Sequence, residues 1–471
     1  MRIIYIITCL PLLFSCQLHR SGCLQAPRVI IPEEYSSQSP EGVDVPDAWW
    51  TEFGSQQLNV IVDQTLMGNL NLKESWAKIA QACARLKIEG AARLPAIDLG
   101  MNAAHFSGQA GRFGPGGGLD GIGESGLPGS NATNFYTLEA TLSYEIDLWR
   151  RVASKTEAAC YELQATREDL DATALTLTGS VVDLWFTIQE QQALLEVIRE
   201  QEEVSRTLLE LVELRFSTAL STALDVFQQR LQLADILAQP PPIHSKLETS
   251  IHNLQTLMGA APGTICLDLD LEIFNGLPPF PKRGAPIDLI CRRPDLRAQY
   301  FRLQSADAEI AAAIADIFPR LDTFFTYGFS AVSIEDLFRE QIKQVILSLV
   351  YPLFDGGRRS GEILRRKAIL CEGIWRYANL FLNAVREVED ALVQEKYQIE
   401  LIQRLEEEIF IANQNLDQSR FHYINGLTDY LSVISAIQSL QNLQRQIVAE
   451  KKQLLVYRAS LYRALGGRVL C

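Results

Sequence analysis

Residues 136–148 read Y-T-L-E-A-T-L-S-Y-E-I-D-L, and this stretch decides the fold. Its even-numbered positions, such as Leu138 and Leu142, are apolar or aromatic, whereas its odd-numbered positions, such as Glu139 and Asp147, are polar. Successive side chains of a strand point to opposite faces, so the stretch predicts a strand with one apolar face and one acidic face. Taken alone, it favours a soluble sandwich over a transmembrane strand, which needs about 9–11 residues. The rest of the chain reverses this preference.

Outside this strand the apolar pattern switches between a period of two and a period near three and a half. Apolar and polar residues alternate over 97–103, ahead of the glycine-rich stretch 107–134, and this predicts a β-hairpin over 96–148. Over 150–216 the apolar residues follow an alternating three–four spacing without proline, which predicts one helix about 100 Å long. A break at 217–222 then predicts a second helix that returns along the first and is interrupted by three consecutive prolines.

The second half of the chain repeats the first. A shift of 207 residues places Tyr144 on Tyr351 and Gly259 on Gly466, with no gap between them. The fold expected is therefore an internal duplication of one unit, which consists of a helix, a β-hairpin, a long helix, a turn and a return helix. The predicted organisation is a signal peptide at 1–15, a lipid-anchored strap at 16–52, a first repeat at 53–262 (hairpin 96–148, long helices 150–258), a proline-rich linker at 263–285 and a second repeat at 286–471 (hairpin 320–354, long helices 361–466).

The composition excludes several classes of function. A formal net charge of −14 argues against a nucleic-acid binder. The nine cysteines form no C-x-x-C pair, and none of the five histidines is paired with a glutamate at metalloprotease spacing. There is also no P-loop and no nucleophile elbow. We therefore expect no catalytic residue, no metal site and no cofactor, and we expect that the protein is not an enzyme.

The N-terminus has the pattern of a bacterial lipoprotein signal. Arg2 precedes an apolar run over residues 3–14, which is too short to span a bilayer and is typical of a secretory signal. The run leads into L-F-S-C at residues 13–16, which resembles a lipobox and makes Cys16 the expected lipidation site. An ordinary cleaved signal without lipid is the alternative. Residues 17–48 carry four prolines and predict an extended strap.

The strands limit how the chain can meet a membrane. Four strands cannot close a barrel, because the smallest membrane barrels have about eight strands, and unpaired strand edges are excluded from lipid. If these strands contact lipid, several chains must share one barrel. The long helices that flank each hairpin would then continue the barrel as a helical cylinder.

A series of motifs, each weak alone, follows in an order that resembles the TolC-like outer-membrane efflux proteins, in particular the lipoprotein branch that serves resistance–nodulation–division pumps. The resemblance covers nearly the whole chain. The motifs are Cys16 with the strap, Trp49-Trp50-Thr51-Glu52-Phe53, Asn69-Leu70-Asn71-Leu72, Tyr144-Glu145-Ile146-Asp147-Leu148-Trp149, Arg215-Phe216, Leu224-Asp225-Val226, Arg292-Arg293-Pro294-Asp295-Leu296-Arg297-Ala298, Phe318-Pro319, Pro352-Leu353-Phe354-Asp355-Gly356-Gly357-Arg358, Tyr423-Ile424-Asn425-Gly426-Leu427 and Ala464-Leu465-Gly466-Gly467.

The resemblance implies a mixed α+β membrane protein of the bacterial outer membrane. It implies a homotrimer with a twelve-strand transmembrane β-barrel, four strands from each chain, continued by a long α-helical barrel through the periplasm. It also implies that substrates pass from an inner-membrane pump of the resistance–nodulation–division type, through a periplasmic adaptor, to the exterior. The expected partners are therefore two further copies of the chain, the adaptor, the pump and outer-membrane lipid.

Two helix turns lie at equivalent places in the repeat, at the end expected to be furthest from the strands. Small residues there leave room for the helices of an adaptor. The expected docking residues are Thr218, Ala219, Leu220 and Ser221 in the first turn, and Asn425, Gly426 and Leu427 in the second.

The resemblance also implies a periplasmic aperture just inside these turns. Tyr423 and Leu431 match aperture residues of the family. The Asp and Arg that help to close the aperture in the family are replaced by Ser435 and Gln438, and Asp429 is the nearest acid that could supply part of the lost charge. Closure is therefore expected to depend more on packing and hydrogen bonds than on ion pairs.

Two other functions fit parts of the pattern. The same fold could be the exit duct of a type I protein-secretion system, although the lipobox and the Trp-Trp strap favour small-molecule efflux. A lipid-anchored coiled-coil scaffold without a pore would explain the helices, but it would leave four alternating strands and the duplication without a purpose. The cluster Arg292-Arg293-Pro294-Asp295 is interpreted as a helix start with a packing role rather than as a binding site.

Overall fold

The computed structural model describes residues 35, 42, 46–108, 131–264, 276–282 and 284–466. The predicted signal peptide, Cys16, most of the predicted strap, the centre of the glycine-rich stretch, part of the linker and Gly467 lie outside the described residues. The chain divides into two compact units. The first takes its described residues from Gln81–Leu163 and Phe301–Gly373, and the second takes them from Pro27–Ala80, Gln164–Tyr300 and Ile374–Cys471.

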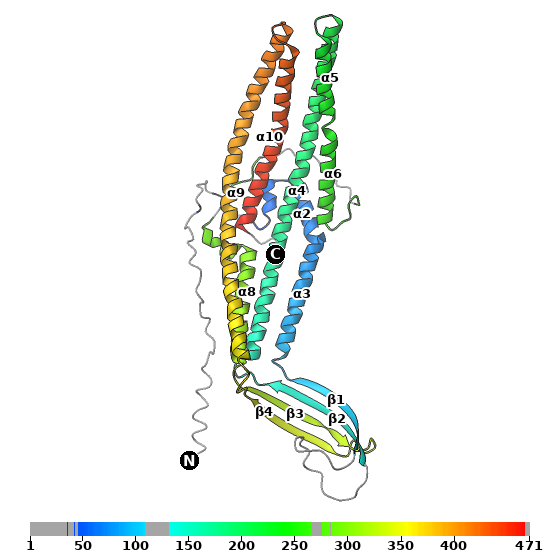
Figure 1. Ribbon diagram of the computed structural model, residues 1–471, viewed down its shortest axis with the longest axis vertical. Coiled ribbons are helices and arrows are strands. Elements are labelled where there is room, and N and C mark those ends of the chain that lie inside the picture. The colour runs from blue at the N-terminus through cyan, green and yellow to red at the C-terminus, as the bar shows by residue number, and fades with distance from the viewer. Residues whose placement is uncertain are drawn as a thin grey trace. The chain divides into compact units, whose positions relative to one another are not determined.

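The first unit contains a four-stranded antiparallel sheet with the strand order β1-β2-β3-β4 (Figure 1). The apolar residue Leu142 of β2 lies opposite Ile97 on one side and Phe325 on the other, and Phe325 in turn lies opposite Val345. These four side chains share one face, so the predicted alternation is confirmed across the whole sheet. The strands are β1 (Ala96–Gly108), β2 (Asn131–Glu145), β3 (Arg320–Ala331) and β4 (Gln341–Val350).

A cluster of side chains ends β2 and starts the long helix that follows it. The carboxylate of Asp147 accepts hydrogen bonds from the backbone N–H groups of Val152, at 3.1 Å, and Ala153, at 2.7 Å. The indole N–H of Trp149 donates to the carbonyl of Pro319 at 2.8 Å, so the turn is also tied to the residue before β3. A carboxylate at a helix N-terminus satisfies N–H groups that have no partner within the helix.

Two helices of 67 residues each, α4 and α9, follow the two hairpins, as the uninterrupted apolar spacing predicts. Within the described part of the chain, no helix combines the length and the apolar character needed to cross a membrane. The helices are η2 (Trp49–Phe53), α2 (Gln56–Gly68), α3 (Leu70–Ala91), α4 (Arg151–Ser217), α5 (Ala223–Leu237), α6 (Pro240–Leu257), η3 (Pro286–Asp288), α7 (Leu289–Arg292), α8 (Pro294–Ala315), α9 (Arg358–Ile424) and α10 (Tyr430–Leu465).

One helix boundary differs from the prediction. The apolar residues between Leu58 and Ile79 predict a single helix that runs to about Ala92. The structure breaks this helix at Asn69, whose side chain accepts from the N–H of Leu72 at 3.0 Å and donates to the carbonyl of Leu257 at 2.7 Å. The predicted interruption of the return helix is confirmed, because α5 ends at Leu237 and the three prolines form the first turn of a new helix, α6, from Pro240. Proline suits that position, where a missing N–H costs nothing.

The duplication extends to individual contacts. Leu142 lies opposite Ile97 in the first hairpin, and Leu349, 207 residues after Leu142, lies opposite Leu321 in the second. In the second unit, the side chain of Asn69 donates to the carbonyl of Leu257, and the guanidinium of Arg293 donates to the carbonyl of Ala464, 207 residues after Leu257. The two repeats therefore share hydrogen-bond positions as well as helices and strands.

The second unit has a core in which aromatic residues and one buried ion pair anchor the connecting segments. Trp49 is fully buried and stacks on Tyr462, with 6.2 Å between the ring centroids. The guanidinium of Arg458 binds the carboxylate of Glu395 with both side chains about 95% buried, and it also donates to the carbonyl of Pro278. The end of the proline-rich linker is therefore held against α9 and α10.

Candidate functional site

The two turns expected to dock a partner join α4 to α5 and α9 to α10 (Figure 1). Leu220 in the first turn and Leu427 in the second are 66% and 65% exposed. Ser221 is partly buried, whereas the other expected docking residues are exposed, namely Thr218, Ala219, Asn425 and Gly426. The apolar side chains at these tips are therefore open to contact in the isolated chain.

The two turns start their following helices in different ways. Thr222 caps α5 through a capping box, in which its hydroxyl accepts from the N–H of Asp225 at 3.3 Å and the carboxylate of Asp225 accepts from the N–H of Thr222 at 3.1 Å. Asp429, which occupies the equivalent place before α10, makes no side-chain capping bond and is exposed. A capping box satisfies two N–H groups that the helix leaves free. The start of α5 is therefore capped by side chains, whereas the start of α10 is not.

Asp225 is the acidic centre of the tips. Its carboxylate accepts from the hydroxyl of Ser221 at 2.8 Å and from the hydroxyl of Tyr423, on α9, at 3.4 Å. Burial raises the pKa of Asp225, but hydrogen bonds from Thr222, Ser221 and Tyr423 outweigh this effect and hold it below its ordinary value of 3.8. Asp225, on α5, is thus the acid at the candidate aperture that contacts the α9–α10 hairpin. Asp429 makes no side-chain capping bond.

Tyr423 links the two turns. Its hydroxyl lies 3.4 Å from the hydroxyl of Ser221, and the guanidinium of Arg215 lies over its ring, 4.9 Å from the centroid. Its ring also packs against that of Tyr430, with the centroids 4.9 Å apart, and the buried hydroxyl of Tyr430 donates to the side chain of Gln229 at 2.8 Å. Tyr423 and Tyr430 therefore tie the α9–α10 hairpin to the α4–α5 hairpin.

The other expected aperture residues fall into two groups. Gln438 donates to the side chain of Gln232 at 2.7 Å, and Gln232 donates to that of Gln441 at 2.9 Å, so Gln438 belongs to a chain of amides between α5 and α10. Leu431 is 58% exposed, and Ser435 is also exposed. Leu431 and Ser435 thus lie on the exposed surface of α10.

Asp225 received no role in the sequence analysis, although it lies within a motif that carries the family resemblance. The local signal was the spacing of Thr222 and Asp225, which is that of a capping box. Its contact with Tyr423, 198 residues further along the chain, has no local signal.

The comparison with protein families decides the assignment. A family model described as outer membrane efflux protein matches residues 61–260 and 285–467. The chain belongs to this family. Outer membrane efflux proteins are channels rather than enzymes, so the protein is an efflux channel component of the outer membrane.

Relatives and solved structures agree with this assignment. The pyoverdine export outer membrane protein OpmQ of Pseudomonas putida is 28% identical over 438 residues, which cover 90% of this chain and 88% of OpmQ. The toluene efflux pump outer membrane protein TtgF of Pseudomonas putida is 26% identical over 433 residues, which cover 89% of this chain and 85% of TtgF. The structure of the outer-membrane channel OprN matches with a TM-score of 0.83 at 23% identity, over 94% of this chain and 99% of OprN. The family and the fold class expected from the sequence are thereby confirmed.

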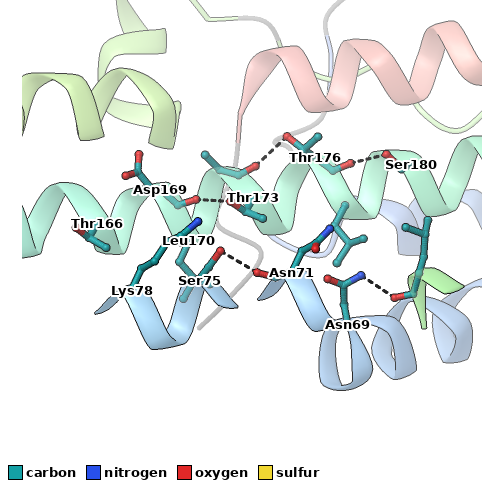
Figure 2. A pocket seen from close by; sticks show the side chains of 13 residues that line it. Asn69, Asn71, Ser75, Lys78, Thr166, Asp169, Leu170, Thr173, Thr176 and Ser180 are labelled. Carbon is teal, nitrogen blue, oxygen red and sulfur yellow. Dashed lines mark hydrogen bonds between the residues drawn. The ribbon is translucent and has the colours of Figure 1, made fainter. Parts of the chain in front are cut away.

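A polar groove of this efflux protein lies between α3 and α4 and has a volume of about 600 Å³ (Figure 2). Its hydroxyl groups donate to carbonyls one turn earlier in their own helices, as Thr173 does to Asp169 at 2.8 Å and Ser75 does to Asn71 at 3.0 Å. Ligand sites in proteins present a few converging polar groups. By contrast, the hydroxyls of Thr173 and Ser75 are used within their own helices.

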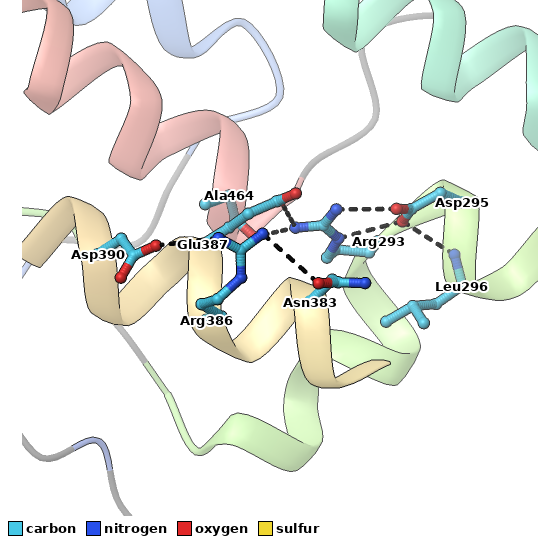
Figure 3. A network of polar contacts seen from close by, with 8 residues as sticks. All are labelled: Arg293, Asp295, Leu296, Asn383, Arg386, Glu387, Asp390 and Ala464. Carbon is cyan, nitrogen blue, oxygen red and sulfur yellow. Dashed lines mark hydrogen bonds and ion pairs between the residues drawn. The ribbon is translucent and has the colours of Figure 1, made fainter. Parts of the chain in front are cut away.

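The cluster around Arg293 is a packing motif (Figure 3). Its guanidinium binds the carboxylate of Asp295 at 2.8 Å and that of Glu387, on α9, at 2.6 Å, and it donates to the carbonyl of Ala464 at 3.3 Å. Pro294 is the first residue of α8. The interpretation of this motif as a helix start with a packing role is therefore confirmed. Over the described ranges, no group of three or more His, Cys, Asp or Glu side chains could hold a metal ion.

Ala219 carries backbone strain at the first tip. Its φ of 59° lies in the left-handed region, and the equivalent residue of the second tip is Gly426, with a φ of 72°. An L-residue in this region costs roughly 1–2 kcal/mol, which glycine avoids. We expect Ala219→Gly to raise the free energy of unfolding by about 1 kcal/mol after the entropy cost of glycine. Denaturant titration of the purified protein measures the free energy of unfolding. Gly426→Ala is the matched control and should lower the free energy of unfolding. Equal effects of the two substitutions would contradict this assignment of strain.

Proposed function

We propose that three copies of this efflux protein form the outer-membrane duct of a tripartite system for small molecules. In this proposal a periplasmic adaptor joins the duct to an inner-membrane pump of the resistance–nodulation–division type. The single observation that carries the proposal is the open sheet, in which β1 and β4 each have one edge that no other described strand pairs with. Its apolar face is exposed, with Leu99 on β1 at 77% and Leu347 on β4 at 65%.

The open sheet supports the trimer on physical grounds. Every backbone N–H and C=O within a membrane must be paired, so an open edge excludes the single chain as a membrane-spanning unit. Three chains with four strands each would supply twelve strands, which is within the range of closed outer-membrane barrels. The long helices of the three chains would then surround one common axis.

The helix tips support a gate at the periplasmic end. We assign closure of the aperture to Tyr423 on α9 and Leu431 on α10. Asp225 accepts a hydrogen bond from Tyr423, and Ser435 and Gln438 lie on α10 with Leu431. Leu220 and Leu427, together with the small residues beside them, would meet the adaptor, because exposed apolar residues at a helical end favour contact with a partner. The names of the relatives, which export pyoverdine or toluene, favour small molecules over the protein substrates of a secretion duct.

Single-channel recording tests the proposed duct. We expect the purified protein in a planar lipid bilayer to give discrete and stable conductance steps, because a closed barrel encloses a water-filled lumen. Mass measurement in detergent should show a trimer. A preparation that keeps its strands, remains monomeric and gives no conductance would instead support the scaffold without a pore.

Cys16 is the proposed lipid attachment site, supported by the lipobox-like residues that precede it. We expect Cys16→Ala, with the rest of the signal intact, to abolish incorporation of a labelled fatty acid. The barrel itself should still insert, because one acyl chain gives only marginal membrane binding. Cys23→Ala serves as the matched control and should keep the label. Label that persists in Cys16→Ala and disappears in Cys23→Ala would move the anchor to Cys23.

A further inference from the structure

The internal duplication specifies how neighbouring subunits pair. We propose that Ser348 on β4 of one subunit lies opposite Asn102 on β1 of the next subunit, and that the remaining residues of this seam follow in antiparallel order. The inference rests on the proposed trimer and adds the register of its strands. Both strands lie at the edges of the sheet (Figure 1).

The two hairpins have the same register. Ile97 lies opposite Leu142 in the first, and Leu321 lies opposite Leu349 in the second. Because Leu349 is the repeat equivalent of Leu142, Leu321 is the equivalent of Ile97. The flanking sequence agrees, since proline precedes and aspartate follows at the same distances in both hairpins, P-A-I-D at 95–98 and P-R-L-D at 319–322.

Inside one chain, the two repeats are joined by the pairing of β2 with β3. There, Thr141 of β2 lies opposite Thr326 of β3, and their hydroxyls are 3.3 Å apart. In a closed ring of three chains, the hairpins would be joined alternately by a β2–β3 pair within one subunit and by a β4–β1 pair between neighbouring subunits. Replacing Thr141 and Thr326 by their repeat equivalents gives Ser348 opposite Asn102. Both residues carry polar side chains that can repeat the hydrogen bond of the two threonines.

The backbone provides an independent check on this register. The N–H of Ile146 donates to Leu321 at 2.8 Å, and the N–H of Ser330 donates to Glu340 at 3.3 Å. Because neighbouring residues of a strand direct their backbone groups to opposite sides, odd-numbered residues of both β4 and β1 direct theirs to the free edges. The proposed register pairs odd with odd residues, such as Leu349 with Met101. A shift by one residue would pair odd with even and leave these groups unbonded.

The side chains favour the same pairing. Leu349 and Met101 are 66% and 67% exposed, and the register places them together on the apolar face. Ser348 and Asn102 lie on the polar face. Slips by two residues would also keep odd with odd, and they would bring Ser348 opposite Gly100 or Ala104. These two slipped registers are the alternatives that an experiment has to exclude.

Disulfide cross-linking in the assembled protein distinguishes the three registers. The matched double variants combine Ser348→Cys with Asn102→Cys, Gly100→Cys or Ala104→Cys. Opposite residues outside the hydrogen-bonded pairs have Cα atoms about 4.5 Å apart, which suits a disulfide, whereas diagonal neighbours are about 7–8 Å apart. A side chain at position 100 fits, because its Cβ would lie 3.9 Å from the nearest atom.

We expect mild oxidation to link the subunits covalently in the variant with Asn102→Cys and to leave the other two unlinked. Ser348→Cys alone controls for the native cysteines. A second pair, Leu349→Cys with Met101→Cys, tests the same register if the first variant does not assemble. Cross-links through position 100 or 104, or none in a protein that is still trimeric, would overturn the register. A protein that is monomeric before oxidation would overturn the proposed trimer instead.

Discussion

Glu395→Ile is expected to lower the free energy of unfolding by about 3–5 kcal/mol, because it leaves the guanidinium of Arg458 buried without its carboxylate. Both side chains of this pair are about 95% buried, and Arg458 also holds the carbonyl of Pro278. The measurement is denaturant titration of the purified protein, followed by the helical circular dichroism signal. Arg458→Ile should have a similar effect, since it leaves Glu395 unpaired.

The double substitution Glu395→Ile with Arg458→Ile is the informative comparison. The equivalent residues of the first repeat are Ile188, which is fully buried, and Ile251, which packs against the same core cluster. A buried ion pair can often be replaced by apolar residues of similar volume at little cost. We therefore expect the double variant to recover most of the lost stability. Asp390→Asn, in an exposed pair with Arg386, is the matched control and should change stability by less than about 1 kcal/mol. Additive losses in the double variant would show that the ion pair is not the source of the effect.

Tyr423→Ala is expected to open the proposed aperture. The substitution removes the ring that lies between Arg215 and Tyr430 and the hydroxyl that reaches Asp225. Loss of an aromatic contact and a cation–π contact costs about 2 kcal/mol per subunit, which favours the open state about thirtyfold for each subunit. Single-channel recording measures this ratio from the open and closed dwell times.

Three further variants separate the contributions at the tips. Tyr423→Phe keeps the ring and should have a smaller effect than Tyr423→Ala. Leu431→Ala should also favour the open state, whereas Asp429→Ala should have little effect, because Asp429 makes no capping bond. The effect of Leu431→Ala should depend little on ionic strength, since apolar contacts are not screened by salt. A larger opening from Asp429→Ala than from Tyr423→Ala would refute this assignment of the gate.

Asp225 at the helix tips should make the proposed gate respond to acid pH. Because the pKa of Asp225 lies below 3.8 while its carboxylate accepts from Thr222, Ser221 and Tyr423, its contribution to these contacts is fully present above that value and is lost as the pH falls through the lowered pKa. We therefore expect the open-to-closed ratio to stay constant between about pH 8 and pH 5 and to rise only below about pH 4. Asp225→Asn should remove that acid response. An unchanged response in this variant would assign it to another group.

The strands, the long helices and the duplication could be predicted from the sequence because each is a local periodic pattern. The alternation around Leu142 identifies one face of a strand, whichever strands lie beside it. The spacing of apolar residues in α4 and α9 needs no knowledge of their partners to indicate long helices. The shift that places Tyr144 on Tyr351 follows from comparing the chain with itself.

The contacts that end helices and hold the tips could not be predicted in this way. The break at Asn69 depends on the carbonyl of Leu257, 188 residues away, and the environment of Asp225 depends on Tyr423, 198 residues away. Neither pair has a periodic signal, because the distance between such residues is set by how the helices pack. The sequence by itself thus determined the elements, their duplication and the family. Only the tertiary structure decided which acid meets Tyr423, since a hydrogen bond depends on the distance between two groups and sequence spacing does not encode that distance.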